Sequence, residues 1–125
     1  MSSHSVIVVD DDRLVRESLC EVLGDLGCSV RDADGGLAAL ASIAREATDM
    51  VISDVDMPDI SGFELLARLP GIRCTAPVIL ISARADAGLT ASARAAGAAE
   101  LLAKPVDIEP FTTLVSALLT RNEDA

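Results

Sequence analysis

The segment SVIVVDDDRLVRESLCEVLGDLGCSVRDA, residues 5–33, decides the fold class of this sequence. It opens with a run of apolar residues at 6–9, which is typical of a central strand covered on both faces. Residues 13–26 follow a helical period, and Gly27 is a natural stop for that helix. The apolar stripe of the helix consists of Val15, Leu19, Val22 and Leu26. A second β-rich run, residues 28–33, completes a strand–helix–strand unit.

The same alternation continues to the end of the chain. Further strands are expected at 50–53, 77–81 and 99–103, and further helices at 37–46, 61–69, 86–96 and 107–120. Five strands that alternate with five helices predict an α/β, doubly wound fold with a parallel sheet and helices on both faces. No repeat or linker divides the sequence. We therefore expect a single domain over residues 1–125, with its core at about 5–120 and a polar tail at 121–125.

Composition narrows the possible functions. The 125 residues are 50% hydrophobic but only 2% aromatic, so the core must be aliphatic. The formal charge of −10 excludes direct contact with nucleic acid, which requires a basic face. No stretch is long enough to span a membrane, and the N-terminus does not read as a signal peptide. Cys20, Cys28 and Cys74 fit no disulfide framework and are expected to be free thiols in a cytoplasmic protein.

Polar residues follow four of the five expected strands. Asp10 and Asp11 come after the first strand, Asp54 after the third, Ser82 after the fourth and Lys104 after the fifth. In a parallel sheet of this class, ligands bind beyond the carboxyl ends of the strands. These side chains are therefore expected to converge on one edge of the sheet.

The chemistry of such an edge is specific. Crowded carboxylates repel one another and favour a hard divalent cation such as Mg²⁺, which binds one or two carboxylates together with phosphate oxygens. A lysine and a hydroxyl group can neutralise and bind the remaining phosphoryl oxygens. A carboxylate can itself act as the nucleophile. The residues alone therefore predict a Mg²⁺-dependent phosphoryl-transfer site with an aspartyl acceptor.

Four segments together carry a resemblance to a known family. They are VIVVDDDRLVRESL, VISDVDMPDISGFELL, VILISARAD and AAELLAKPVD, at residues 6–19, 51–66, 78–86 and 98–107. With them the sequence resembles the receiver domain of two-component response regulators, the CheY-like superfamily, over about residues 6–119. The resemblance implies a flavodoxin-like three-layer (βα)5 sandwich with strand order 2-1-3-4-5.

The resemblance also implies roles for the residues at the strand ends. Asp54 matches the phosphoacceptor. Asp11 matches a direct ligand of Mg²⁺ (or Mn²⁺), and Asp10 matches an acid that acts through water. Ser82 matches the hydroxyl that turns toward the phosphoryl group, and Lys104 matches the lysine that pairs with a phosphoryl oxygen.

Further positions match the family's pattern around this site. The backbone carbonyl of Asp56 would be another metal ligand, together with the carboxylate of Asp54. Pro105 follows Lys104 in a peptide bond that is commonly cis in the family, and Gly62 matches the glycine that closes the loop after the acceptor. Asp56 and Arg84 match the positions that tune phosphate lifetime in the family. The two side chains could pair and partly shield the phosphoryl group from attacking water.

One position departs from the family. The family usually has an aromatic residue three positions before the lysine, and this sequence has Leu101 there. The usual coupled movement of hydroxyl and aromatic side chains therefore cannot operate in its standard form. We expect the phosphorylation chemistry to survive this change, whereas the route of the signal to the output surface stays open.

The family implies a function and partners as well. The chain would take a phosphoryl group from the phosphohistidine of a sensor histidine kinase or a histidine phosphotransfer protein, and would switch an output domain or a downstream protein. It would catalyse its own phosphorylation and autodephosphorylation without turning over a separate substrate, so it is not expected to be an enzyme. A monomer and a phosphorylation-dependent homodimer are both compatible with the sequence.

Two other interpretations stay open at this point. Asp54-Val55-Asp56 fits the D-x-D motif of haloacid-dehalogenase-like phosphatases, although that family places the motif first in the chain. A degenerate receiver used only for binding is the other, and the departure at Leu101 keeps it open. Among the remaining acids, Asp12 and Asp86 are expected to cap helices, and Asp59 is expected to be a loop residue.

Overall fold

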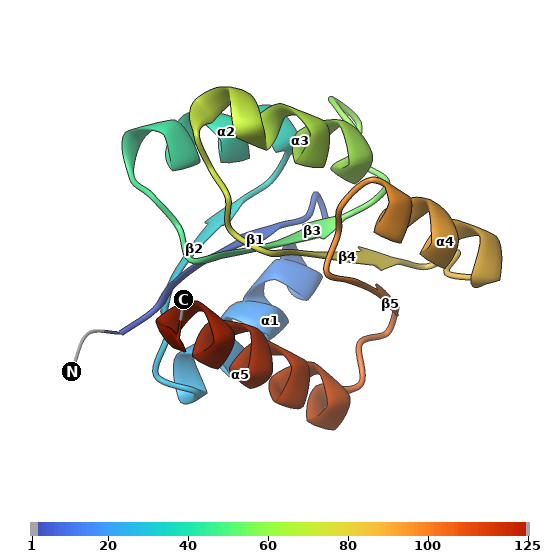
Figure 1. Cartoon of the computed structure of the whole chain (residues 1–125). Helices are drawn as coiled ribbons and strands as arrows, with labels where there is room; N and C mark the ends of the chain where they lie inside the picture. The colour runs from blue at the N-terminus through green and yellow to red at the C-terminus, as the bar shows by residue number, and fades with distance from the viewer. Residues whose placement is uncertain (1–2, 125) are drawn as a thin grey trace.

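Five parallel strands form the middle layer of the structure, a computed structural model that describes residues 3–124 (Figure 1). Their order in the sheet is β2-β1-β3-β4-β5, which confirms the expected topology. The strands are β1 (Ser5–Val9), β2 (Ser29–Ala33), β3 (Met50–Asp54), β4 (Val78–Ser82) and β5 (Glu100–Ala103). The three central strands, β1, β3 and β4, are almost entirely buried, as their continuous apolar runs predict.

Helices cover both faces of this sheet (Figure 1). They are α1 (Arg13–Asp25), α2 (Gly36–Arg45), α3 (Gly62–Arg68), α4 (Ala87–Ala95) and α5 (Ile108–Asp124), with a short 3-10 helix at Leu69–Ile72. Helices α1 and α5 pack on one face, and α2, α3 and α4 pack on the other. The doubly wound three-layer sandwich is therefore confirmed.

Alternation along each strand divides the core into two clusters. In β1, Ile7 and Val9 face α2 and α3, whereas Val6 and Val8 face α1 and α5. Both clusters are largely aliphatic, as the composition requires, although Phe111, on the face of α5 that packs on the sheet, is fully buried. The two faces are thus filled by side chains of opposite parity from the same strands.

Some element boundaries differ from those expected. Asp54 and Ser82 are the last residues of β3 and β4, not the first residues of loops, because they pair in register with Ile81 and Ala103. After α3 the chain continues as a 3-10 turn through Pro70, whose missing N–H is tolerated at a helix start. Helix α5 continues through Asp124, so residues 121–124, expected as a polar tail, extend the helix. Residue 125 lies outside the described residues.

Within residues 3–124 the structure has neither a disulfide nor a helix suited to span a membrane. The three cysteines are free and form no disulfide, as their spacing predicts. Burial raises the pKa of the Cys20 and Cys28 thiols, which keeps them in the protonated form. In this part of the chain, no helix combines the length and apolar character that crossing a bilayer requires.

Candidate functional site

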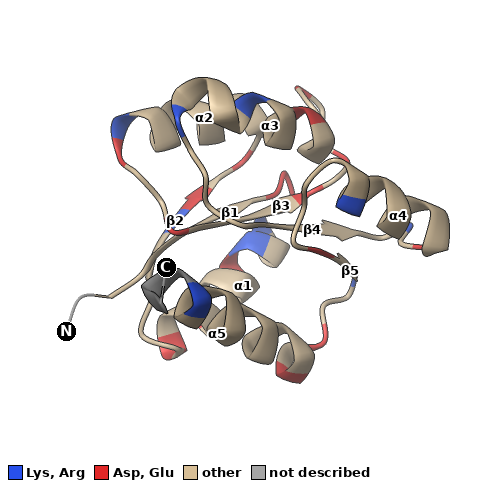
Figure 2. Cartoon of the chain, in the orientation of Figure 1, with Lys and Arg blue, Asp and Glu red and all other residues tan. Residues whose placement is uncertain are grey.

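Three carboxylates converge at the carboxyl ends of β1 and β3. Asp10 is fully buried and Asp54 is only 5% exposed, whereas Asp11 beside them is exposed. One oxygen from each residue lies within 4.8 Å of the other two. Figure 2 shows the acidic residues on the loop that follows β1, at the edge where β3 also ends. The predicted convergence of these three acids is therefore present in the structure.

Lys104 lies among these carboxylates. Its Nζ is 2.8 Å from Oδ2 of Asp10 and 3.3 Å from Oδ2 of Asp54. Burial alone would lower the pKa of Lys104, but the two carboxylates outweigh it and the pKa is raised. Lys104 follows β5 and is therefore a positive charge that links Asp10, after β1, to Asp54, at the end of β3.

The acidic cluster retains excess negative charge even with this lysine in place. Burial, followed by repulsion from Asp10, raises the pKa of Asp54, and Lys104 offsets this effect only in part. Oδ1 of Asp10 accepts a hydrogen bond from the backbone N–H of Asp12, whereas Oδ2 is paired with Lys104 at 2.8 Å and has no further partner among the described residues. A set of carboxylate oxygens whose charge one lysine compensates only in part fits a hard divalent cation.

Arg16 supports this cluster from α1, and the sequence analysis did not identify it. Its Nη1 donates to the backbone carbonyl of Asp10 at 2.9 Å, and its Nε donates to Asp32 on β2 at 3.1 Å. The arginine thereby ties the loop after β1 to the neighbouring strand. Its place in the first turn of the helix, four residues after Asp12, was the one available signal.

Ser82 lies at the end of β4, fully buried. Its hydroxyl oxygen accepts a hydrogen bond from the backbone N–H of Arg84 at 3.0 Å. The guanidinium group of Arg84 binds the carboxylate of Asp56 through contacts of 2.7 and 3.3 Å, and both side chains are exposed. The expected pair of Asp56 and Arg84 is therefore present, and it joins the loops that follow β3 and β4.

Gly62 closes the loop after Asp54 for a steric reason. A Cβ atom at this position would lie 2.4 Å from the backbone oxygen of Asp54. The N–H of Gly62 donates to the carbonyl of Val55 at 2.9 Å. Any larger residue would therefore displace the backbone that carries Asp54.

Leu101 and Pro105 flank the lysine on β5 and after it. Leu101 is 7% exposed and packs into the cluster beneath α2, α3 and α4. The Lys104–Pro105 peptide bond is cis, as the resemblance implies. Pro105 also lines a groove of about 520 Å³, and Lys104 forms part of the wall of the same groove.

The smaller assignments of acids are confirmed in two cases and incomplete in a third. Asp12 caps α1 through the N–H groups of Leu14 and Val15, and Asp86 caps α4 through Leu89. Asp59 does lie in a loop, but its carboxylate binds the N-terminus of α2. The one sequence signal for that contact is the pair of glycines, Gly35 and Gly36, at the start of α2.

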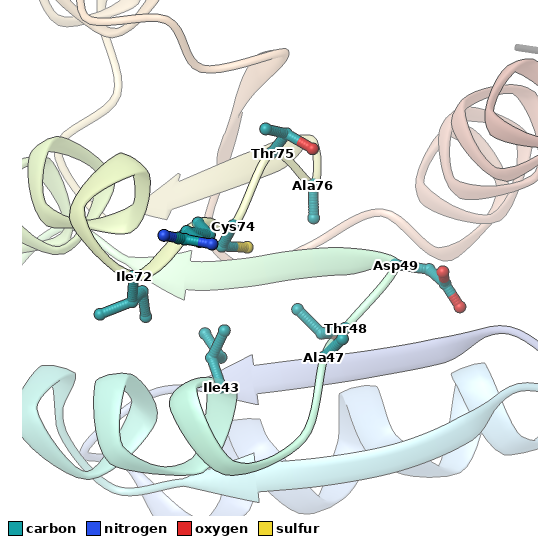
Figure 3. Close-up of a pocket in the computed structure, with 9 residues that line it drawn as sticks. Ile43, Ala47, Thr48, Asp49, Ile72, Cys74, Thr75 and Ala76 are labelled. Atoms are coloured by element: carbon teal, nitrogen blue, oxygen red, sulfur yellow. The ribbon is translucent and has the colours of Figure 1, made fainter.

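A second hollow lies at the opposite edge of the sheet (Figure 3). It has a volume of about 360 Å³ and is formed by the connections before β3 and β4, with Thr48, Asp49 and Cys74 among its lining residues. Thr48 Oγ1 donates to the carbonyls of Ser5 and Met50, and Asp49 accepts from the N–H of Ser5 at 2.7 Å. These polar groups serve the backbone, and none belongs to the acidic cluster.

Comparisons with known proteins agree with this geometry. The sequence pattern of the family described as "Response regulator receiver domain" matches residues 6–116. The chain is 38% identical to the response regulator MprA of Mycobacterium tuberculosis, over 98% of this chain and 54% of that protein. It is 34% identical to the DNA-binding transcriptional regulator NtrC of Azospirillum brasilense, over 98% of this chain and 25% of that protein. The chain thus spans about half the length of the first of these relatives and a quarter of the second.

A solved structure gives the same result for the fold. The chemotaxis protein CheY4 of Vibrio cholerae superimposes with a TM-score of 0.85 at 28% identity, over 94% of this chain and 99% of that one. The family pattern covers most of the chain, and the relatives that share it are response regulators. This chain therefore belongs to the receiver domains of response regulators, the phosphorelay signalling modules of two-component systems.

Proposed function

We propose that Asp54 accepts a phosphoryl group from the phosphohistidine of a partner protein in a Mg²⁺-dependent reaction. The observation that carries this proposal is the position of Lys104, 3.3 Å from Asp54 and 2.8 Å from Asp10. A buried carboxylate held between a lysine and two further acids is suited to bind a dianionic group together with a cation.

The transfer needs few protein groups. An oxygen of Asp54 attacks phosphorus, the bond from phosphorus to the imidazole nitrogen breaks, and its electron pair returns to the imidazole. Lys104 neutralises a phosphoryl oxygen and stays paired with Asp10. Asp10, Asp11, Asp54 and the backbone carbonyl of Asp56 would hold Mg²⁺ (or Mn²⁺), with Asp10 acting through water. When bound, the ion supplies positive charge to the phosphoryl oxygens.

Ser82 provides the link to a conformational change. Its hydroxyl oxygen accepts from the N–H of Arg84 in the unphosphorylated chain. Turning toward a phosphoryl group on Asp54, where the hydroxyl would donate, breaks that bond and frees the loop between β4 and α4. This loop is bonded directly to the hydroxyl, so the rotation would alter it first. Leu101, by contrast, is already buried.

The groove beside Lys104 suits a partner that carries the phosphohistidine. It lies between the start of α1 and the β5–α5 connection, and Lys104 forms part of its wall. Leu14 at its edge is 75% exposed and Ile108 is 48% exposed, so an apolar surface adjoins the acceptor. We expect Leu14→Ser to slow transfer from a phosphorylated histidine kinase or phosphotransfer protein without slowing labelling by acetyl phosphate. Equal slowing with both donors would argue against a docking role.

The phosphorylation signal is proposed to act on a further domain or protein. Because the curated relatives are longer and one is named a DNA-binding regulator, an attached output domain or a separate downstream protein is proposed as the recipient of the signal. Both a monomer and a dimer formed on phosphorylation fit this role. The three free thiols favour the cytoplasm as the compartment.

The chain is proposed to turn over no separate substrate. A phosphatase that uses Asp54 and Asp56 would need the second carboxylate available for acid–base catalysis. Asp56 is instead bound by Arg84 at 2.7 Å, which favours the receiver over the phosphatase. Steady release of product from a generic phosphomonoester would reverse this preference.

The test is intact mass measured after incubation with acetyl phosphate, with and without Mg²⁺. We expect one phosphoryl adduct that requires Mg²⁺, is released by hydroxylamine as an acyl phosphate should be, and is absent from Asp54→Asn. Full labelling of Asp54→Asn would exclude this acceptor. No adduct with acetyl phosphate or with phosphorylated kinases would favour a degenerate receiver used for binding.

A further inference from the structure

The N-terminus of α2 is bound by a residue from a distant loop. Gly35 is the N-cap residue of this helix and supplies no side-chain hydrogen bond. The carboxylate of Asp59, from the β3–α3 loop, accepts from the N–H of Gly36 at 3.2 Å and from the N–H of Leu37 at 2.9 Å. A negative charge at a helix N-terminus accepts hydrogen bonds from the free N–H groups and interacts favourably with the positive end of the helix dipole.

Two glycines make this contact possible. A Cβ atom on Gly35 would lie 2.8 Å from Oδ2 of Asp59. A Cβ atom on Gly36 would lie 2.4 Å from Cγ1 of Ile60, the neighbour of Asp59. Oδ1 of Asp59 also accepts from the N–H of Ile60 at 2.7 Å, which fixes the loop's own conformation. The loop and the helix are therefore in contact through a polar and an apolar residue side by side.

The same loop begins at the candidate site. Asp56, whose carbonyl is a proposed metal ligand, lies three residues before Asp59. On the α3 side the loop is held by Gly62, whose N–H donates to Val55, and by Ser61, which caps α3. On the α2 side it is held by Asp59 and Ile60, and α2 lies beside α3 on the same face of the sheet (Figure 1).

We infer that Asp59 is a positioning residue for the phosphoryl-transfer site, which anchors the β3–α3 loop to α2 and so fixes the carbonyl of Asp56 for the metal. This inference rests on the proposed function of that site. The carboxylate touches neither substrate nor metal, and it acts through the backbone between positions 56 and 59. The hydrogen bond from Leu37, foremost, lowers the pKa of Asp59, so the anchor is ionised at neutral pH.

The test compares Asp59→Ala with Asp86→Ala, a matched loss of a helix cap in a loop without a proposed metal ligand. We expect Asp59→Ala to weaken Mg²⁺ binding, followed by NMR titration of backbone amides, by up to about tenfold, the cost of losing a direct hydrogen bond to a metal ligand, because Asp59 acts on Asp56 through the backbone. Phosphorylation by acetyl phosphate should slow in parallel. Asp86→Ala should keep the wild-type Mg²⁺ affinity, although both variants should unfold at a lower temperature.

Asp59→Asn is the conservative variant. It keeps Oδ1 as the acceptor for Gly36 and Ile60 but loses the bond from Leu37, so its Mg²⁺ affinity should fall between wild type and Asp59→Ala. If Asp59→Ala does not fold, this variant carries the test with a smaller shift. Wild-type affinity in Asp59→Ala, or an equal loss in Asp86→Ala, would overturn the inference. Failure of wild type to take a phosphoryl group would instead count against the proposed function, because the Mg²⁺ titration does not depend on phosphorylation.

Discussion

The two edges of one sheet use polar residues in opposite ways. At the carboxyl edge, Asp10 and Asp54 are buried close together, and a single lysine compensates them in part. At the amino edge, Thr48 and Asp49 bind backbone groups of neighbouring strands (Figure 3). The first edge holds charge in an unfavourable environment and the second uses polar groups to close the sheet. Buried carboxylates that are compensated only in part are thus the feature that distinguishes the functional edge from the structural one.

The largest contrast between the edges should appear in metal binding. Asp11→Ala removes a carboxylate from the acidic cluster and should weaken Mg²⁺ affinity by more than the roughly tenfold that an outer contact costs. Asp49→Ala removes a carboxylate from the amino edge and should leave the affinity unchanged. Titration of both variants with Mg²⁺ by NMR decides the matter. Unchanged affinity in Asp11→Ala would remove this residue from the metal site.

A smaller contrast concerns the lifetime of the phosphorylated state. Arg84→Ala breaks the exposed pair with Asp56 at the mouth of the site and should admit water more easily. We expect phosphate loss to accelerate about two- to fivefold, since an exposed ion pair contributes little energy. Arg73→Ala, an exchange at the amino edge, is the control and should keep the wild-type rate. The decay of the phosphoryl adduct by mass supplies both rates, and slower decay in Arg84→Ala would contradict a shielding role.

Stability should change in opposite directions at the two edges. The pKa of Asp54 is raised in the fold, so its contribution to stability is present below the unfolded pKa of about 3.9 and is lost as pH rises through the raised value. In Mg²⁺-free buffer at pH 7, Asp54→Asn should therefore raise the melting temperature by a few degrees, the scale of about 1 kcal/mol. This gain should vanish as the pH falls below about 4.

Asp49→Ala provides the opposite arm of that experiment. It loses the hydrogen bond from the N–H of Ser5 and should lower the melting temperature at neutral pH. Thermal unfolding followed by circular dichroism measures both variants. A lower melting temperature for Asp54→Asn would show that Lys104 more than offsets the burial of the carboxylate.

The smallest effect is expected at Leu101, which lies inside the core and at neither edge. Leu101→Tyr restores the aromatic residue usual in the family but adds no group to the acidic cluster. Phosphorylation by acetyl phosphate should proceed at nearly the wild-type rate in a time course by mass. A large change in rate would show that position 101 takes part in the chemistry.

Most of the fold and the composition of the acidic cluster could be predicted from the sequence. The apolar runs, the helical stripe of α1 and the order of acids after the strands are local patterns, and local patterns determine secondary structure and sheet class. The convergence of Asp10, Asp54 and Lys104 then follows from the parallel sheet. The ends of β3 and β4 were missed by one residue because register, which pairs Asp54 with Ile81, is a property of two strands together.

The tertiary structure alone decided the contacts between loops. Asp59 could be assigned to a loop from the sequence, but its hydrogen bonds to α2 join residues 22 and 23 positions apart. Arg16 likewise reaches the carbonyl of Asp10 only because α1 packs against that end of the sheet. Such contacts depend on how helices settle on the sheet, and no periodicity of a single segment encodes that arrangement. Which groups meet at the carboxyl edge therefore follows from the order of residues along the chain, whereas the way their loops are held follows from the packing of the helices.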